Sequence, residues 1–347
     1  MMRVGLDAQL AVGTATGIGE FVRGLAEALR ARSDLEVVSL AAPWLDPWRF
    51  DRRVAWDQAL LPASALRARC ELLHCASGTA PLVGAPYVVT VHDVAWLRVQ
   101  QHARWYARAY FGRFALARYA RARALMVDSR FSRDELLETA HLEPAAVSVV
   151  EPGVAAAFAA LERAPDERPF VLAVGTVERR KNLEVAIRAL RAHPGLRLVS
   201  VGPATPYADE CRRIAAACGV SGAVEFRGYV TPDELLDLYA RCAFAAVPSR
   251  YEGFGYGVAQ ARCAGVPIVA ADSSSLPDVA GGAATLVAPD DEAGWSDAFG
   301  AVLAARGAAE HRAAEDRPRA IARFDWSTAA AAVVAVYRGA LGRPPPG

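Results

Sequence analysis

Short apolar runs alternate with segments whose apolar residues recur at helical spacing along most of this chain. The clearest runs are Tyr87–Val91, which consists of β-branched and aromatic residues, and Phe170–Gly175, which is almost continuously apolar. Strands that are buried on both faces of a parallel sheet have this composition. Alternation of such strands with helices is typical of sheets with helical crossovers, so the pattern predicts an α/β protein.

The same pattern predicts the individual elements. Strands are expected at Arg3–Asp7, Leu35–Leu40, Leu72–Cys75, Tyr87–Val91, Ala124–Asp128, Val147–Val150, Phe170–Gly175, Arg197–Gly202, Ala223–Arg227, Phe244–Val247 and Val266–Ala270. Helices are expected at Phe21–Arg30 and Arg104–Arg123, from Ser132 onward, from Asn182 to Ala192, and from Thr231 to Cys242. The stretch Pro43–Pro62 is expected to be a long surface connection.

The length of 347 residues is sufficient for two domains, each with its own hydrophobic core. The Pro-containing and charged stretch Arg163–Pro169 is expected to link them. Internal repeats are not detectable, because the two halves share only the alternation of strands and helices.

Composition and charge restrict the class of protein. With 53% hydrophobic and 22% charged residues the chain is globular, and a formal net charge of +1 gives no overall attraction to nucleic acid. The six cysteines form no C-x-x-C pair, so we expect reduced thiols and no zinc site. Asp7 interrupts the apolar segment that a signal peptide would need, and no apolar run is long enough to cross a bilayer. A cytoplasmic protein is expected.

The stretch around Glu252 is the strongest candidate for chemistry. Glu252 lies in a loop with three closely spaced glycines, and a short helix of small residues follows, ended by Gly265 and Pro267. Glycines let main-chain amides approach a ligand, and a helix N-terminus offers donors to hydroxyl or phosphate oxygens. This combination suits a sugar nucleotide. The alternative is a tight turn whose acidic residue interacts with the helix dipole.

Two further segments lie at the ends of predicted strands. Residues 13–20 form a glycine-rich stretch in which Gly17 and Gly19 give G-x-G, but Val22 stands where a dinucleotide fingerprint needs its third glycine. The alternative is a simple strand-to-helix turn. His92 follows the strand Tyr87–Val91 at the edge where parallel sheets bind ligands, although an isolated histidine can also be structural.

Adjacent cations follow the strand Phe170–Gly175 and precede a helix. Arg180 can bind a phosphate through two N–H groups and Lys181 offers a compact charge, so the pair suits a diphosphate. Arg179 is expected to be a solvated neighbour. A run of three basic residues can otherwise be entirely solvated.

The expected helix Arg104–Arg123 interleaves aromatic residues with arginines. A basic amphipathic helix with aromatics can lie at an anionic membrane surface. Alternatively, the aromatics pack inward while the arginines stay in water. Single-stranded nucleic acid would also suit aromatics and cations, but no basic domain accompanies this helix, so no nucleic-acid partner is expected.

The segment Glu252-Gly253-Phe254-Gly255, with Gln260 eight positions after Glu252, resembles the E-x7-E signature of retaining glycosyltransferases of family 4. Further family motifs are matched in order at 16–19 (TGIG), 91–93 (VHD), 128–132 (DSRFS), 175–182 (GTVERRKN) and 274–278 (SSLPD). Two positions depart from the family pattern. Gln260 replaces the usual glutamate, and Tyr256-Gly257 replaces the usual Leu-Pro.

The resemblance implies the GT-B fold, in which two doubly wound Rossmann-like domains face a central cleft. It implies that residues 1–163 form the acceptor-side domain and that residues 164–323 bind the nucleotide sugar. Residues 324–347 would form a helix that crosses back onto the first domain.

The resemblance also implies catalytic roles. His92 is expected beside the donor sugar, where it would bond a hydroxyl or the leaving phosphate, and Asp93 is expected to orient His92 or local backbone. Arg180 and Lys181 are expected to bind the diphosphate. Glu252 is expected to hold sugar hydroxyls.

The remaining donor contacts are expected mainly from main-chain groups. The amides of Phe254 and Gly255 would hold sugar hydroxyls, and Gln260 would bond the ribose with a neutral amide instead of a carboxylate. The other expected donor-binding residues are Gly17, Gly19, Gly202, Tyr229, Val230 and Gly253.

The implied activity is retaining transfer of a hexose from a GDP-mannose or UDP-sugar type of donor to a glycan, a glycolipid or a small-molecule hydroxyl. No D-x-D motif is present, so neither a metal nor another cofactor is expected. Two other functions on the same fold remain open: a sugar-nucleotide-binding protein without transferase activity, and a sugar-nucleotide epimerase. A nicotinamide-dependent enzyme would need the dinucleotide fingerprint that is missing.

Overall fold

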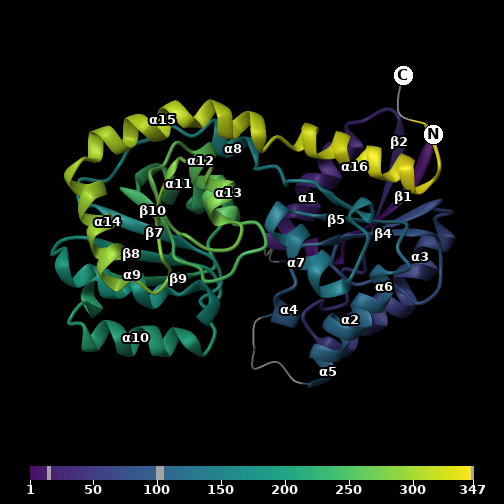
Figure 1. The fold of residues 1–347 in the computed structure, drawn as a ribbon, viewed down its shortest axis with the longest axis horizontal. Helices are drawn as coiled ribbons and strands as arrows, with labels where there is room; N and C mark the ends of the chain where they lie inside the picture. The colour runs from purple at the N-terminus through teal and green to yellow at the C-terminus, as the bar shows by residue number, and fades with distance from the viewer. Residues whose placement is uncertain (14–16, 99–104, 345–347) are drawn as a thin grey trace. The chain divides into compact units, whose positions relative to one another are not determined.

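The computed structural model describes residues 1–13, 17–98 and 105–344 (Figure 1). The chain divides into two compact units. Unit 1 comprises Met1–Gly153 together with Asp325–Gly347, and unit 2 comprises Val154–Phe324. Each unit contains one six-stranded sheet in which every strand pairing is parallel, with helices on its faces. The prediction of an α/β protein with two Rossmann-like domains is confirmed.

The sheet of unit 1 has the order β2-β1-β3-β4-β5-β6. Its strands are β1 (Met2–Asp7), β2 (Leu35–Leu40), β3 (Leu72–Cys75), β4 (Tyr87–Val91), β5 (Ala124–Val127) and β6 (Val147–Val149). Its helices are α1 (Gly17–Arg30), α2 (Phe50–Ala55), α3 (Leu61–Arg67), α4 (Ala95–Arg98), α5 (Trp105–Arg108), α6 (Ala115–Tyr119), α7 (Arg130–Ala140) and α16 (Trp326–Ala340).

Helix α16 belongs to unit 1 although it follows unit 2 in the chain. It packs beside α1, where the ring of Trp326 lies against the backbone of Gly24 so closely that a Cβ there would come within 2.2 Å of the ring. Further along α16 the buried Tyr337 hydroxyl lies 2.7 Å from Nδ1 of His74 in β3. Burial lowers the pKa of His74 to about 3, so this contact holds a neutral imidazole.

The sheet of unit 2 has the order β12-β11-β10-β7-β8-β9. Its strands are β7 (Phe170–Val174), β8 (Arg197–Val201), β9 (Val224–Gly228), β10 (Phe244–Val247), β11 (Ile268–Ala271) and β12 (Ala284–Val287). Its helices are α8 (Ala156–Ala159), α9 (Leu183–Ala189), α10 (Tyr207–Ala217), α11 (Pro232–Arg241), α12 (Tyr256–Cys263), α13 (Leu276–Ala280), α14 (Glu292–Ala304) and α15 (Arg306–Arg323).

The boundary between the units lies ten residues before the predicted one, at Gly153 and Val154 rather than at 163 and 164. The Phe158 ring packs on Tyr239 at 5.2 Å between centroids, and Arg163 donates to main-chain oxygens of Ala240 and Cys242 at 3.1 and 2.8 Å. These contacts attach Phe158, which precedes the expected linker, and Arg163, its first residue, to unit 2. The polar composition of the linker did not predict them.

Other differences concern helix ends. The region predicted as a single helix over Arg104–Arg123 contains, within its described residues, α5, a π-helical turn at Ala109–Phe114 and α6. The stretch Pro43–Pro62 is not a plain connection, because it contains α2 and a second π-helical turn, Trp56–Leu60, that runs into α3. None of the helices in the described ranges is both long enough and apolar enough to span a membrane.

Candidate functional site

Glu252 lies in the loop between β10 and α12, with its side chain 9% exposed. Its carboxylate accepts hydrogen bonds from Ser249 Oγ at 2.7 Å, from Arg180 Nη1 at 3.1 Å and from Lys181 Nζ. Burial alone would raise the pKa of Glu252, but the charges of Lys181 and Arg180 outweigh it and lower the pKa to about 2. The structure therefore brings together the three residues that the sequence assigned to sugar and diphosphate.

The two cations come from a 3-10 turn, Arg179–Lys181, that follows β7. Asn182 ends this turn in the left-handed region at φ 54° and donates to the Pro289 carbonyl at 2.7 Å. Arg180 also donates from Nε to Glu178 at 2.8 Å. Arg179 points elsewhere, because its side chain is 62% exposed and pairs with Glu210, in agreement with its expected role as a solvated neighbour.

Three consecutive serines after β11 hold the main chain of the Glu252 loop. Ser274 Oγ accepts from the Glu252 amide at 2.9 Å, and Ser275 Oγ donates to the carbonyls of Glu252 and Phe254 at 3.0 and 2.7 Å. Ser273 Oγ donates to the Ser249 carbonyl at 2.7 Å. Sequence analysis missed this support, although the Ser-Ser-Leu-Pro match was its signal.

The start of α12 presents main chain rather than side chains. Gly255 caps the helix at φ 98°, and a Cβ there would lie 2.7 Å from Leu276, so both conformation and space require glycine. The Phe254 side chain is buried against Phe324 and Tyr256. Phe254 and Gly255 can thus serve a ligand through their amides at the positive end of the helix dipole.

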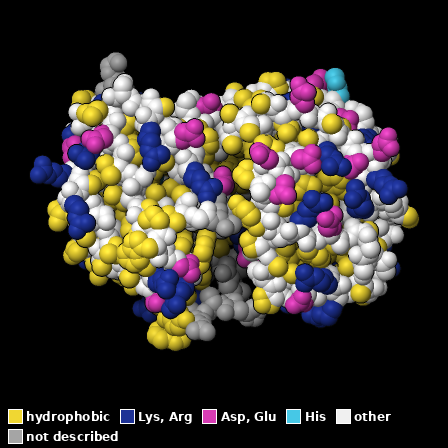
Figure 2. Space-filling model, turned by 180° about the vertical axis from the view of Figure 1, so that it is seen from behind, with side chains coloured by type: hydrophobic (Ala, Val, Ile, Leu, Met, Phe, Trp, Pro, Cys, Tyr) yellow, Lys and Arg dark blue, Asp and Glu magenta, His cyan; other side chains and the backbone are white. Residues whose placement is uncertain are grey.

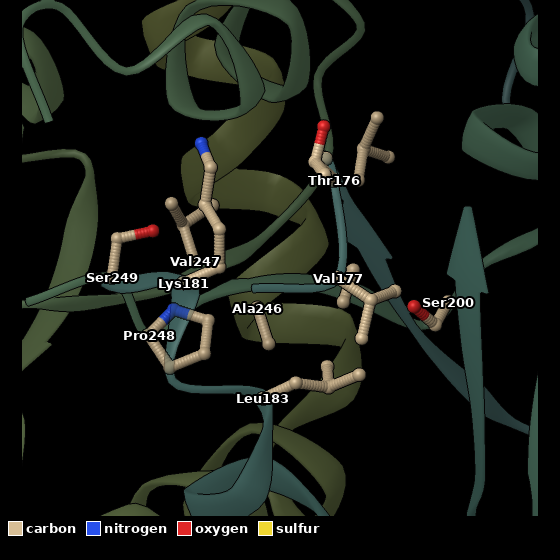
Figure 3. A pocket seen from close by; sticks show the side chains of 12 residues that line it. Thr176, Val177, Lys181, Leu183, Ser200, Ala246, Val247, Pro248 and Ser249 are labelled. Carbon is tan, nitrogen blue, oxygen red and sulfur yellow. The ribbon is translucent and has the colours of Figure 1, made fainter. Parts of the chain in front are cut away.

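A small cavity of about 20 Å³ lies at the carboxyl ends of β7 and β10 (Figure 3). Lys181 and Ser249 line it beside Thr176, and its volume is close to that of one water molecule. The Lys181 amine and the Ser249 hydroxyl therefore stand at the edge of the sheet where parallel α/β proteins bind their ligands.

The remaining predicted donor residues of unit 2 are more scattered. Gly202 follows β8 at φ 139°, and a Cβ there would lie 2.2 Å from the Gly175 carbonyl oxygen, so packing of two backbone segments already requires its glycine. Tyr229 and Val230 follow β9. Tyr229 is 50% exposed, while Val230 packs on the hydrophobic core.

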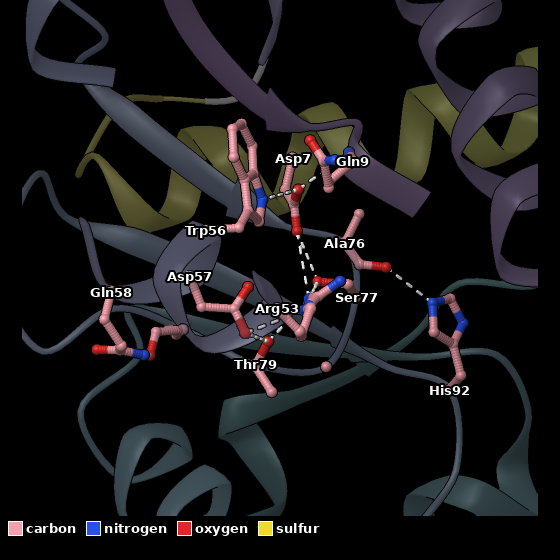
Figure 4. A network of polar contacts seen from close by, with 12 residues as sticks. Asp7, Gln9, Arg53, Trp56, Asp57, Gln58, Ala76, Ser77, Thr79 and His92 are labelled. Carbon is pink, nitrogen blue, oxygen red and sulfur yellow. Dashed lines mark hydrogen bonds and ion pairs between the residues drawn. The ribbon is translucent and has the colours of Figure 1, made fainter. Parts of the chain in front are cut away.

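In unit 1, His92 lies directly after β4 with both ring nitrogens engaged. Nδ1 lies 2.6 Å from Oδ2 of Asp128, and Nε2 donates to the Ala76 carbonyl at 2.9 Å (Figure 4). Burial disfavours the imidazolium, but the Asp128 carboxylate outweighs this and raises the pKa of His92. Asp93 accepts from the Ala95 amide at 3.0 Å and so orients local backbone, as expected.

Gly17 and Gly19 do not lie in an open loop. Both belong to the first turn of α1, which begins four residues earlier than predicted, and Gly19 is buried. The preceding residues 14–16 lie outside the described part of the chain.

Comparison with known proteins identifies the family. A family model described as "Glycosyltransferase Family 4" matches residues 15–158, and one described as "Glycosyl transferases group 1" matches residues 157–317. The chain belongs to glycosyltransferase family 4. The resemblance on which the sequence analysis relied is therefore confirmed.

Curated relatives of this family 4 member include the glycogen synthase of Mycobacterium tuberculosis, 32% identical over 283 residues, which are 77% of this chain and 66% of that protein. The D-inositol 3-phosphate glycosyltransferase of Xylanimonas cellulosilytica is 34% identical over 246 residues, 64% of this chain and 58% of that protein. The chain thus spans less than two thirds of either relative.

Solved structures show the same GT-B fold. Sucrose-phosphate synthase from Thermosynechococcus elongatus has a TM-score of 0.80 at 20% identity, covering 99% of this chain and 100% of that one. Anabaena HepE in complex with UDP and glucose has a TM-score of 0.78 at 17% identity, covering 97% and 99%.

Gln260 is the main departure of this family 4 chain from the usual signature. It lies on α12, and its Oε1 accepts from the buried Tyr239 hydroxyl at 3.2 Å. Because the hydroxyl occupies the amide oxygen, Gln260 can offer a ligand its N–H donors, whereas the usual glutamate would offer an acceptor.

A buried ionic network in unit 1 was not predicted from the sequence (Figure 4). Arg53, 4% exposed, donates from Nε to Oδ2 of the fully buried Asp57 at 3.0 Å and lies 3.7 Å from Asp7 at the end of β1. Thr79 and Tyr110 donate to the same Asp57 oxygen at 2.6 and 2.9 Å. The four-residue spacing of Arg53 and Asp57 was a usable signal only once a helix was assigned there.

In residues 1–13, 17–98 and 105–344, no group of three or more histidine, cysteine, aspartate or glutamate side chains is arranged to hold a metal ion.

Proposed function

We propose that this glycosyltransferase transfers a hexose from a nucleoside-diphosphate sugar, with retention at the anomeric carbon and without a metal. The observation that carries the proposal is the contact of Glu252 with Arg180 and Lys181 at the N-terminus of α12. Arg180, Lys181 and the first amides of α12 would stabilise the charge of the leaving diphosphate, a role that metal ions fill in other transferases. The donor is of the UDP-sugar or GDP-mannose type.

In the proposed reaction the acceptor hydroxyl attacks the face from which the diphosphate leaves. The bond between the anomeric carbon and the phosphate oxygen breaks while the bond to the acceptor oxygen forms, and a phosphate oxygen takes the acceptor proton. Glu252 would hold sugar hydroxyls together with the amides of Phe254 and Gly255. His92 would contact the donor only if its Nε2–H leaves the Ala76 carbonyl.

The nucleoside is proposed to lie over the ends of β8 and β9. Tyr229 and Val230 follow β9 and would offer main-chain groups to the base, and Gln260 would donate to a ribose hydroxyl through its amide nitrogen. Gly202 contributes close packing at the end of β8.

A thermal-shift and hydrolysis screen against GDP-, UDP-, dTDP- and ADP-sugars tests the proposal. A donor present at a hundredfold its Kd should stabilise the protein by about 2.7 kcal/mol, and the same donor should be hydrolysed slowly without an acceptor. Glu252→Ala should abolish hydrolysis and transfer. A protein that binds a donor and never cleaves it would instead be a binding module, and conversion of one sugar nucleotide into another without an acceptor would indicate an epimerase.

The acceptor is proposed to be a glycan, a lipid-linked saccharide or a small-molecule hydroxyl. Curated relatives are named as glycogen synthase and as an inositol phosphate glycosyltransferase, so both polymer and small-molecule acceptors occur among similar proteins. Transfer of radiolabelled sugar to a panel of these acceptor classes, with the donor found above, distinguishes them.

A peripheral membrane contact of unit 1 is favoured by its exposed tryptophans. Trp44, Trp48 and Trp105 are 73%, 57% and 80% exposed. The ring of Phe50 lies 4.7 Å from that of Tyr106, so the segments that carry Trp48 and Trp105 are in contact. Figure 2 shows hydrophobic side chains on this unit with basic and acidic ones around them, and the basic ones suit anionic lipid headgroups.

Sedimentation with vesicles tests this contact. The wild type should sediment with vesicles that contain phosphatidylglycerol and not with pure phosphatidylcholine, and the double substitution of Trp48 and Trp105 by alanine should abolish sedimentation. Tyr229→Ala removes an exposed aromatic of unit 2 and serves as the control. Equal sedimentation of the double variant and the wild type would refute the contact.

A further inference from the structure

The proposed diphosphate site is electrically compensated by protein carboxylates. Arg180 pairs with Glu178 at 2.8 Å and with Glu252 at 3.1 Å, and Lys181 pairs with Glu252. Two positive charges thus face two negative charges. The side chains of both cations are 22% exposed, so this compensation lies at the surface of unit 2, where a ligand can replace it.

The neighbouring arginines do not supply surplus charge to this site. Arg179 pairs with Glu210, and Arg250 pairs with Glu184 at 3.0 Å and with Asp290 at 2.7 Å. A diphosphate that approaches Arg180 and Lys181 must therefore exchange with carboxylates already in place. Glu252 is the principal one, because it bonds both cations.

Glu252 can give up these cations at low cost only if other donors replace them. Its pKa of about 2 keeps it ionised at every working pH, and a buried carboxylate without partners is strongly unfavourable. An intact donor carries sugar hydroxyls that can bond the released carboxylate. A nucleoside diphosphate that has lost its hexose carries no hexose hydroxyls, and its ribose hydroxyls lie on the far side of the diphosphate.

We propose that Glu252 is a specificity-determining residue that discriminates the intact sugar nucleotide from the nucleoside diphosphate product by competing with the product for Arg180 and Lys181. The inference rests on the proposed function. Its consequence is that cleavage of the sugar restores the contacts of Glu252 with both cations and weakens the hold on the diphosphate. Product release is thereby favoured by the same carboxylate that recognises the substrate.

Glu252→Gln tests the competition, because the amide keeps the shape of the side chain and removes its charge. Titration calorimetry at fixed salt should show that the variant binds inorganic pyrophosphate, UDP or GDP at least tenfold more tightly than the wild type. Affinity for the intact sugar nucleotide should stay equal or fall. The ratio of the two affinities therefore reverses in favour of the product.

Two further variants keep the test decisive. Glu178→Gln removes a carboxylate that touches Arg180 but not Lys181, so it should tighten pyrophosphate binding by a smaller factor. Glu210→Gln removes the partner of the neighbouring Arg179 and should leave pyrophosphate affinity unchanged. Circular dichroism and a melting curve establish that each variant is folded.

The outcomes separate this inference from the proposed function. If the wild type binds sugar nucleotides but Glu252→Gln binds pyrophosphate and UDP no more tightly than the wild type does, the competition is refuted and the proposed function stands. If pyrophosphate affinity rises in Glu252→Gln while no sugar nucleotide binds the wild type, the charge competition holds and the proposed function fails.

Discussion

Both units place carboxylates and cations at the carboxyl ends of parallel strands, but the two clusters differ in exposure. In unit 2 the side chains of Arg180 and Lys181 are 22% exposed around Glu252. In unit 1 the corresponding figures are 4% for Arg53 and 0% for Asp57. The first cluster is partly open to solvent, as the proposed exchange with a ligand requires, whereas the second is buried and supports the loops around it.

Arg53→Met gives the largest effect that this comparison predicts. Removal of the guanidinium leaves Asp7 and Asp57 buried without their cation, which should destabilise unit 1 by ~3–5 kcal/mol. Urea unfolding followed by tryptophan fluorescence measures the loss. Arg49→Met removes an arginine from an exposed pair and should cause no measurable loss of unfolding free energy. Equal destabilisation by both variants would show that burial of the Arg53 network does not increase its contribution to stability.

Lys181→Ala tests the partly exposed cluster of unit 2. Stability should fall less than in Arg53→Met, because Arg180 and Ser249 still bond the buried Glu252 carboxylate. Donor affinity should fall about a hundredfold, or ~2.7 kcal/mol. Calorimetry with the sugar nucleotide identified in the screen gives the number. Arg179→Ala, the adjacent cation that points away, is the matched control, and a similar loss in it would place the diphosphate elsewhere.

Asp128→Asn probes an intermediate case, a pair in which His92 is 14% exposed and Asp128 4%. The pair raises the pKa of His92, so its stabilisation is present below the ordinary histidine pKa of about 6.5 while Asp128 stays ionised, and it is lost as pH rises through the folded value. Burial raises the pKa of Asp128, so the pair is lost again when that carboxylate protonates in acid. Asp128→Asn should cost ~1.5–3 kcal/mol while both groups are charged and less at high pH. Unfolding free energies across this pH range, with NMR titration of the His92 ring, measure it, and a loss that does not vary with pH would contradict the assignment.

Gln260→Glu has the smallest expected effect. The carboxylate can still accept from Tyr239 and would offer the ribose an acceptor, so UDP should bind up to about tenfold more tightly relative to dTDP, which lacks the 2′-hydroxyl. An unchanged UDP to dTDP ratio would separate Gln260 from the ribose.

The two clusters also differ in how far the sequence predicted them. Glu252, Arg180 and Lys181 stand in short motifs at the ends of clear strands, and each local pattern pointed to the same ligand. Arg53 and Asp57 lie on helical turns, but the tryptophans and prolines of this stretch predicted a loop. Without a predicted helix, their four-residue spacing did not indicate an ion pair. Ser274 and Ser275 were matched as part of a motif, but their bonds to the Glu252 main chain depend on the pairing of β10 with β11.

The predicted position of the unit boundary differs from the observed one for a related physical reason. A polar composition indicates a linker only when the residues do not pack against a domain. Arg163 does pack, because its guanidinium donates hydrogen bonds to main-chain oxygens of unit 2. His92 shows that the position of a single residue can be predicted without its contacts. Its position was predicted, but its two partners come from the ends of β5 and β3, just after each strand, and only the assembled sheet brings them together.

The place of α16 has a consequence for biosynthesis. Since Trp326 and Tyr337 complete the packing of unit 1 and are translated after all of unit 2, the first half of the chain must leave the ribosome with one flank of its sheet uncovered. Unit 2, by contrast, is contiguous and can finish folding as it emerges. A released fragment that ends at residue 324 should therefore contain a folded second half and a first half that chaperones still recognise.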